Sequence, residues 1–253
     1  MALMAEGVTG VVYAYETHVL FVGALVATAR HKHHAGQVMW APGGMDVEGE
    51  DGVRRHAATH VVRPDRLHSH GAAAVAAVLW VDRDDLQWEL SPKVPRDVDR
   101  EFPATVAERP GDALSPQDAR DLARALLNLV AQGHDPRACA PRHPAVRRMC
   151  ALLESTASER EISMTELARQ SGLSMRQLRH RFTEELGINP SAYLRWRRLR
   201  RAMASIERGA TLTQAALEGG FADSAHFSRV FRAHFGMAPS RAISSVRFVG
   251  SLT

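Results

Sequence analysis

A pattern that occurs twice near the end of the chain constrains its fold most strongly. Each copy reads as a short amphipathic helix, a glycine-containing turn and a second helix with apolar residues four apart. The first copy is "SMTELARQSGLSMRQLRHRFTEELG", and the second, about 50 residues later, is "ATLTQAALEGGFADSAHFSRVFRAHFG". Because a short helix, a tight turn and a second helix make up a helix-turn-helix, the sequence predicts two such units.

Polar residues at the predicted helix starts support this interpretation. Ser163 with Glu166, and Thr211 with Gln214, have the spacing of a capping box, in which each side chain satisfies a free backbone N–H group. Gly172 can end the first helix in a tight turn. The two units therefore have the local signals of helix boundaries as well as the apolar pattern.

One long helix is predicted between the two units. Asn189 can cap it, Pro190 fits its first turn, and Gly209 follows its end. Nineteen residues of helix would span roughly 28 Å at 1.5 Å per residue. Such a helix could hold two recognition helices at a fixed separation, and successive major-groove segments on one face of DNA lie about 34 Å apart.

The charge is divided unevenly along the chain. Residues 1–144 have a net charge of −4 and residues 145–253 a net charge of +8, and all 17 basic residues of the second part are arginines. The planar guanidinium group matches phosphate and guanine edges, which lysine does not. This distribution suggests that the second part alone binds nucleic acid.

Residues from about 146 to 248 resemble the DNA-binding domain of the AraC/XylS family of bacterial transcription regulators. The resemblance rests on "ELARQSGLSMRQLRHRFTEELGINPSAYLRWRRLRRA" and on "GGFADSAHFSRVFRAHFGMAPS". The second stretch is the more specific, with G-F, then S-R-x-F, then F-G-x-x-P-S. The resemblance implies double-stranded promoter DNA as a partner, a homodimer, RNA polymerase as a further partner, and no enzymatic activity.

The same resemblance assigns the residues that face the bases. They fall on the second helix of each unit, and helical geometry places the same residues opposite the core-facing Leu178 and Phe182 in the first unit and Phe227 and Phe231 in the second. They are Arg176, Arg179, His180, Ser224, Ala225, His226, Ser228 and Arg229. For the arginines, contact with a base edge and contact with a phosphate are both open. For the two histidines we expect phosphate or structural roles, and Ala225 departs from the polar residues common at its position.

The first part of the chain reads as strands. From residue 8 to about 90, short apolar and partly β-branched runs alternate with glycine and proline turns, which suggests a sandwich or barrel. Residues 91–114 have the composition of a connection with little regular structure. Ser115 and Pro116 can start a helix whose apolar stripe packs on its own sandwich or against a second copy of the chain.

A histidine-rich stretch in this part resembles the first cupin motif. "HKHHAGQVMW" supplies His31, His33 and Gln37, with glutamine in place of the usual glutamate. "VVRPDRLHSH" resembles the second cupin motif through His68, with Arg66 in place of the usual glycine. Three imidazoles and an amide could bind one divalent metal ion such as Zn, Ni, Mn or Fe.

Other interpretations of the histidines stay open. They could bind an organic effector by hydrogen bonds, or they could stabilise strands, and a metal set that includes His70 is an alternative. If His31 and His33 share one face of a strand, His34 alternates to the other face and is expected to be exposed.

The sequence thus predicts an α+β chain with a cupin-like sensor (residues 1–114), a dimerisation or packing helix and linker (115–144), and a double helix-turn-helix domain (145–253). The sensor is expected to be an antiparallel β-barrel and the last domain to be all-α. The expected function is a transcription regulator controlled by a small molecule or metal in the barrel; the alternative is a metal-dependent cupin enzyme fused to a DNA-binding domain. No apolar run reaches the roughly 18 residues of a membrane helix, and only two cysteines occur, so we expect a cytoplasmic protein without membrane partners.

Overall fold

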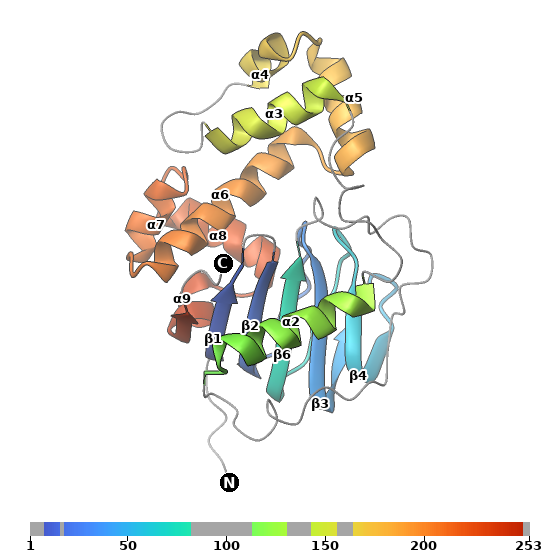
Figure 1. Ribbon diagram of the computed structural model, residues 1–253, viewed down its shortest axis with the longest axis vertical. Helices are drawn as coiled ribbons and strands as arrows, with labels where there is room; N and C mark the ends of the chain where they lie inside the picture. Colours follow the sequence, from blue (N-terminus) through green and yellow to red (C-terminus); the bar gives the residue numbers. More distant parts are fainter. Residues whose placement is uncertain (1–7, 16–17, 82–112, 131–142, 156–163, 250–253) are drawn as a thin grey trace. The chain divides into compact units, whose positions relative to one another are not determined.

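The computed structural model describes residues 8–15, 18–81, 113–130, 143–155 and 164–249 (Figure 1). The chain forms two compact units. Unit 1 combines Met1–Asp135 with Phe231–Thr253, and unit 2 is Pro136–Val230. Among the described residues, no helix is both long and apolar enough to cross a membrane.

Unit 1 is built on one sheet. Its strands are β1 (Thr9–Ala14), β2 (His18–Leu25), β3 (Gly36–Glu48), β4 (Arg54–Val62), β5 (Ser69–His70), β6 (Ala73–Val81) and β7 (Ser245–Val249). The strand order is β4-β3-β6-β2-β1-β7, and β5 pairs with β3. The pairs are antiparallel except for β1 with β7, which is parallel. The predicted strand-rich first part of the chain is therefore confirmed.

Helix α2 (Pro116–Val130) covers part of this sheet. It begins as predicted, because the Ser115 hydroxyl accepts a hydrogen bond from the Asp118 N–H at 3.1 Å. Its apolar stripe, which includes Leu122 and Leu126, lies in the same core as sheet residues such as Leu79. Of the two alternatives for this helix, packing on its own sheet is the one that the structure shows.

Unit 2 is helical. It contains α3 (Pro144–Ser155), α4 (Met164–Gln170), α5 (Met175–Leu186), α6 (Pro190–Glu207) and α7 (Leu212–Glu218). The next helix, α8 (Ser224–Phe235), starts in unit 2 and ends in unit 1, and α9 (Pro239–Ile243) lies in unit 1. Met149 of α3, Phe182 of α5 and Tyr193 of α6 share one core, so the first helix-turn-helix packs against its flanking helices.

The predicted helix caps are confirmed where the structure describes them. Thr211 and Gln214 form a capping box at the start of α7, and Asn189 caps α6. A second capping box, not predicted, joins Ser174 and Gln177 at the start of α5. Glu166 accepts a hydrogen bond from the Arg169 guanidinium at 2.6 Å. Ser163, its predicted capping partner, lies outside the described residues.

The end of the chain differs from the predicted all-α domain, and the units do not follow the predicted boundaries. Residues 245–249, "SVRFV", form β7, which pairs with the edge of β1 (Figure 1). The physical reason is a β-branched and aromatic strand whose Val246 and Val249 pack, partly buried, against the two cores of unit 1. Residues 231–253, like α2, therefore belong to unit 1.

The packing of α2 gives a stability prediction. Leu126→Ala removes a fully buried side chain and is expected to lower the free energy of unfolding by about 2–5 kcal/mol. The loss, measured by urea denaturation, should be the same at low and high protein concentration, because the contact is internal to unit 1. Arg124→Ala, an exposed change on the same helix, is the control and should cost under about 1 kcal/mol. A change in oligomeric state without loss of stability would contradict the internal packing of α2.

Candidate functional site

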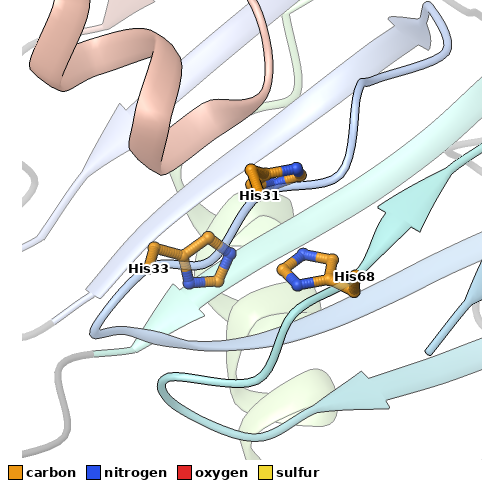
Figure 2. A group of neighbouring side chains, drawn as sticks. All are labelled: His31, His33 and His68. Carbon is orange, nitrogen blue, oxygen red and sulfur yellow. The ribbon is translucent and has the colours of Figure 1, made fainter. Parts of the chain in front are cut away.

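Three of the predicted histidines come together in unit 1. His31 and His68 face each other in an isolated antiparallel bridge, with N···O distances of 2.8 and 2.9 Å between their backbones, and His33 follows two residues later. One ring nitrogen from each of the three lies within 4.8 Å of the others (Figure 2). All three side chains are buried, so the group is a closed cluster of imidazoles.

The backbone fixes the tautomer of each ring. The Nδ1–H groups of His31, His33 and His68 donate to the carbonyl oxygens of Ala29 at 2.8 Å, Ala35 at 2.7 Å and Arg66 at 2.9 Å, respectively. Because a carbonyl oxygen only accepts hydrogen bonds, Nδ1 carries the proton in each neutral ring and Nε2 carries the lone pair. This is the arrangement in which a histidine is oriented as a metal ligand by a second hydrogen bond.

Gln37, near the start of β3, completes the cluster. Its side-chain oxygen lies 3.1 Å from His33 Nε2 and 3.0 Å from His68 Nε2. Both of these nitrogens are acceptors in the tautomers just described, and an amide oxygen is also an acceptor. In this orientation of the Gln37 amide, the converging atoms hold no proton between them, and a cation would satisfy them.

Burial keeps the rings uncharged at neutral pH. It lowers the pKa of His31 and His33 to about 4 and that of His68 to about 2, and in His68 the neighbouring His33 and His31 add to the effect. Neutral imidazole is the form that binds metals. Three imidazole nitrogens and one amide oxygen fit a divalent ion such as Zn, Ni, Mn or Fe.

Two other histidines have different places. His70 lies on β5 with its ring centre 6.5 Å from that of His31, outside the close group, and its Nδ1 bonds the Gly71 carbonyl at 2.9 Å. The expectation that His34 is exposed is wrong: the residue is 3% exposed and its Nδ1 lies 3.1 Å from Asp65. The segment forms only a bridge at His31, so the alternation of a regular strand does not apply to it.

A pocket adjoins the cluster. It has a volume of about 450 Å³, which is within the size range of small-molecule sites, and His68 forms part of its wall. Arg55 and Arg66 also line it, and each forms an ion pair, with Asp51 at 2.6 Å and with Glu50 at 2.9 Å. Unit 1 therefore has room for an organic ligand beside the histidines.

The first predicted DNA-facing group lies on α5. Arg176, Arg179 and His180 are exposed, and Leu178 and Phe182 on the opposite face are fully buried. His180 Nδ1 lies 3.0 Å from the carboxylate of Glu184, one turn later. The exposed face thus presents two guanidinium groups that can reach base edges or phosphates.

The second group lies on α8. Ala225 and Arg229 are exposed, whereas Ser224, His226 and Ser228 are half-buried. The His226 N–H donates to the Asp223 carboxylate at 2.6 Å, and its ring meets the edge of Phe221 with centres 5.3 Å apart. The His226 ring thus contacts a buried aromatic residue, and its phosphate or structural role stays a prediction.

Helix α6, which connects the two helix-turn-helix units, adds positive charge. Burial and the nearby Arg198 and Arg197 lower the pKa of Arg201 to about 10, so Arg201 remains cationic at neutral pH. Its buried Nη1 has no hydrogen-bond partner among the described residues. A phosphate oxygen is the kind of acceptor that such a group can bind.

Comparison with known proteins supports the two helix-turn-helix units. Residues 167–244 match a family of proteins described as a helix-turn-helix domain. The HTH-type transcriptional activator RhaS of Escherichia coli is 35% identical over 80 residues, which are 31% of this chain and 29% of RhaS. The chain thus spans under a third of the length of the curated relatives that it matches.

Two solved structures resemble the fold. Both are of ToxT from Vibrio cholerae. One, bound to (E)-4-(8-methylnaphthalen-1-yl)but-3-enoic acid, has a TM-score of 0.56 at 13% identity, over 89% of this chain and 97% of that one. The other, bound to an unsaturated fatty acid, has a TM-score of 0.56 at 12% identity, over 92% and 98%. They support an architecture with a sheet domain and a helical helix-turn-helix region.

The matched residues 167–244 contain α4 with α5 and α7 with α8, the two helix-turn-helix units. Their spacing, caps and buried positions agree with the pattern expected from the sequence. Residues 167–244 therefore form a helix-turn-helix domain, which supports the resemblance of this part of the chain to the AraC/XylS DNA-binding domain.

Proposed function

We propose that the protein binds double-stranded DNA in a sequence-specific manner and regulates transcription. The observation that carries this proposal is the pair of helix-turn-helix units, each with a second helix whose core face is buried and whose other face presents exposed arginines. The helical part of the chain also has its basic residues as arginines, which suit phosphates and guanine edges. The similarity to RhaS, a transcriptional activator, supports the same function.

In this proposal each of the three helices has its own role. The exposed arginines of α5 and α8 would contact base edges, where a bidentate arginine–guanine pair contributes about 1–3 kcal/mol of discrimination. The arginines of α6 would contact phosphates, which position the protein without reading the sequence. The exposed methyl group of Ala225 leaves only apolar contact at its position.

We further propose that a ligand in unit 1 controls DNA binding, and that this ligand is a divalent metal ion held by His31, His33, His68 and Gln37. The support is the set of acceptor atoms that converge without a proton between them. A bound ion would supply positive charge there and would tie together two loops and the start of β3. The alternative is an organic ligand in the adjoining pocket, which the bound acids of the two ToxT structures favour.

The DNA-binding proposal is tested by Arg179→Ala. Loss of a bidentate contact from the exposed face of α5 is expected to weaken binding to a preferred duplex by about 1–3 kcal/mol and to relax the preference at one base position. The measurement is selection of duplexes from a random library by the full chain, followed by titration of the selected duplex.

Arg181→Ala is the matched control, because Arg181 is an exposed arginine of α5 outside the predicted base-facing group. It should weaken binding by less and leave the base preferences unchanged. Unchanged affinity and preferences in Arg179→Ala would show that this helix does not read the sequence as proposed.

The metal proposal is tested by elemental analysis of the untagged full chain after equilibration with Zn²⁺ and gel filtration. We expect near one ion per chain in the wild type and loss of the ion in the His31→Ala/His33→Ala double variant. Gln37→Glu is expected to bind Zn²⁺ more tightly, because a carboxylate adds a charge that the amide lacks. His56→Ala, a change at an exposed histidine outside the cluster, is the control.

A metal-free arrangement also exists for this cluster. If the Gln37 amide is turned over, its NH₂ group can donate to both His33 and His68. In that case Gln37→Glu would replace donors by acceptors and destabilise the protein without binding Zn²⁺. A metal-free wild type, or a double variant that retains the ion, would refute the proposed site.

A further inference from the structure

The end of α8 lies against the histidine cluster within unit 1. The ring of Phe235, the last residue of α8, is 6.5 Å from the ring of His33 and 6.3 Å from the ring of Trp80. The next residue, Gly236, accepts a hydrogen bond through its carbonyl from the Ala29 N–H at 3.3 Å. The proposed ligand site is therefore bordered by residues about 200 positions away in the sequence.

Ala29 links the histidine cluster directly to the turn after α8. Its carbonyl oxygen accepts the hydrogen bond from His31 Nδ1 at 2.8 Å, and its N–H donates to Gly236. One residue thus orients a ligand ring and holds the turn that ends α8. If ligand binding shifts His31, the movement would be transmitted to Gly236 through the two hydrogen bonds of Ala29.

Gly236 is required at this contact for two reasons. Its φ is +69°, a left-handed conformation that favours glycine. A Cβ atom at this position would lie 2.5 Å from the Ala29 carbonyl oxygen and 2.7 Å from His31 Nδ1. Gly209 also has a positive φ, of +90°, but a Cβ there would have no neighbour within 4 Å. Of these two glycines, only Gly236 makes a close approach to its neighbours.

Strand β7 holds the same segment on the sheet. It pairs in parallel with β1 from Thr9↔Ser245 to Tyr13↔Val249. Met237 and Val246 pack against one core of unit 1. An interaction with His234, in the last turn of α8, contributes to the lowered pKa of His31 and His33, so this turn lies near the cluster.

We propose that residues 231–249 form a coupling segment that closes the histidine site and fixes the last turn of α8, so that occupation of this site and DNA binding by α8 affect each other. This inference rests on the proposed function. It adds the route of regulation. The route runs from His31 and His33 through Ala29 to Phe235 and Gly236, at the end of α8. By thermodynamic linkage, DNA must change the affinity for the ligand by the same factor as the ligand changes the affinity for DNA.

The test measures that factor in the full chain. Zn²⁺ is the probe of the histidine site, and a duplex selected from a random library is the DNA. Zn²⁺ affinity, from competition with a chromophoric chelator, is expected to change at least about fivefold when the duplex is present. Gly236→Ala should bring the factor close to one, whereas Gly209→Ala, which has the same backbone strain without the contact, should leave it unchanged.

Phe235→Leu is a second variant that keeps an apolar side chain at the end of α8 and removes the aromatic contact with His33. It should also reduce the factor while the protein stays folded. A factor of one in the wild type, or a factor that persists in both Gly236→Ala and Phe235→Leu, overturns the coupling.

Failure of the proposed DNA binding can be distinguished from failure of the coupling. A chain that enriches no duplex overturns the proposed DNA binding and this inference with it, whereas an enriched duplex without coupling overturns the inference alone. If Zn²⁺ does not bind, the coupling is read from amide hydrogen exchange in Ser245–Val249. The duplex should then change exchange in the wild type and in Gly209→Ala but not in Gly236→Ala, and unchanged exchange in the wild type refutes the coupling.

Discussion

The short backbone bridge between His31 and His68 is the contact on which the ligand site depends. It joins two loops through reciprocal hydrogen bonds of 2.8 and 2.9 Å and brings the centres of two buried imidazole rings to 4.3 Å from each other. Carbonyl oxygens two residues from each histidine then fix the tautomers. Without the bridge, nothing in the backbone would hold the rings of His31 and His68 close to each other and to Gln37.

Features governed by near neighbours in the chain were predictable from the sequence. The caps of α6 and α7 depend on residues three positions apart, and both agree with the prediction. The buried positions Leu178, Phe182 and Phe227 follow from helical periodicity alone. The identities of His31, His33, Gln37 and His68 as one group came from the resemblance to cupin motifs, and the structure brings these four together.

Features that depend on distant pairing were not predictable. Nothing in "SVRFV" indicates that it would join the edge of a strand some 235 residues earlier, because a parallel pair has no local turn to reveal it. The burial of His34 has a similar cause: the loop that carries it is shaped by Asp65 and by the bridge to His68, not by a strand period. The approach of Gly236 to Ala29 follows from the same long-range pairing.

The energetics of the cluster also argue for a ligand. Burying a polar group costs free energy unless it is hydrogen-bonded, and an apolar core of equal volume would stabilise the sheet at least as well. Here each imidazole has its N–H satisfied by a carbonyl, and Nε2 of His33 and of His68 lies at 3.1 and 3.0 Å from the side-chain oxygen of Gln37. With the Gln37 oxygen toward the rings, the acceptors face one another and suit a cation, whereas with the amide turned over its NH₂ group would satisfy both rings. In the first arrangement, the turn after α8 is placed to respond when that cation binds.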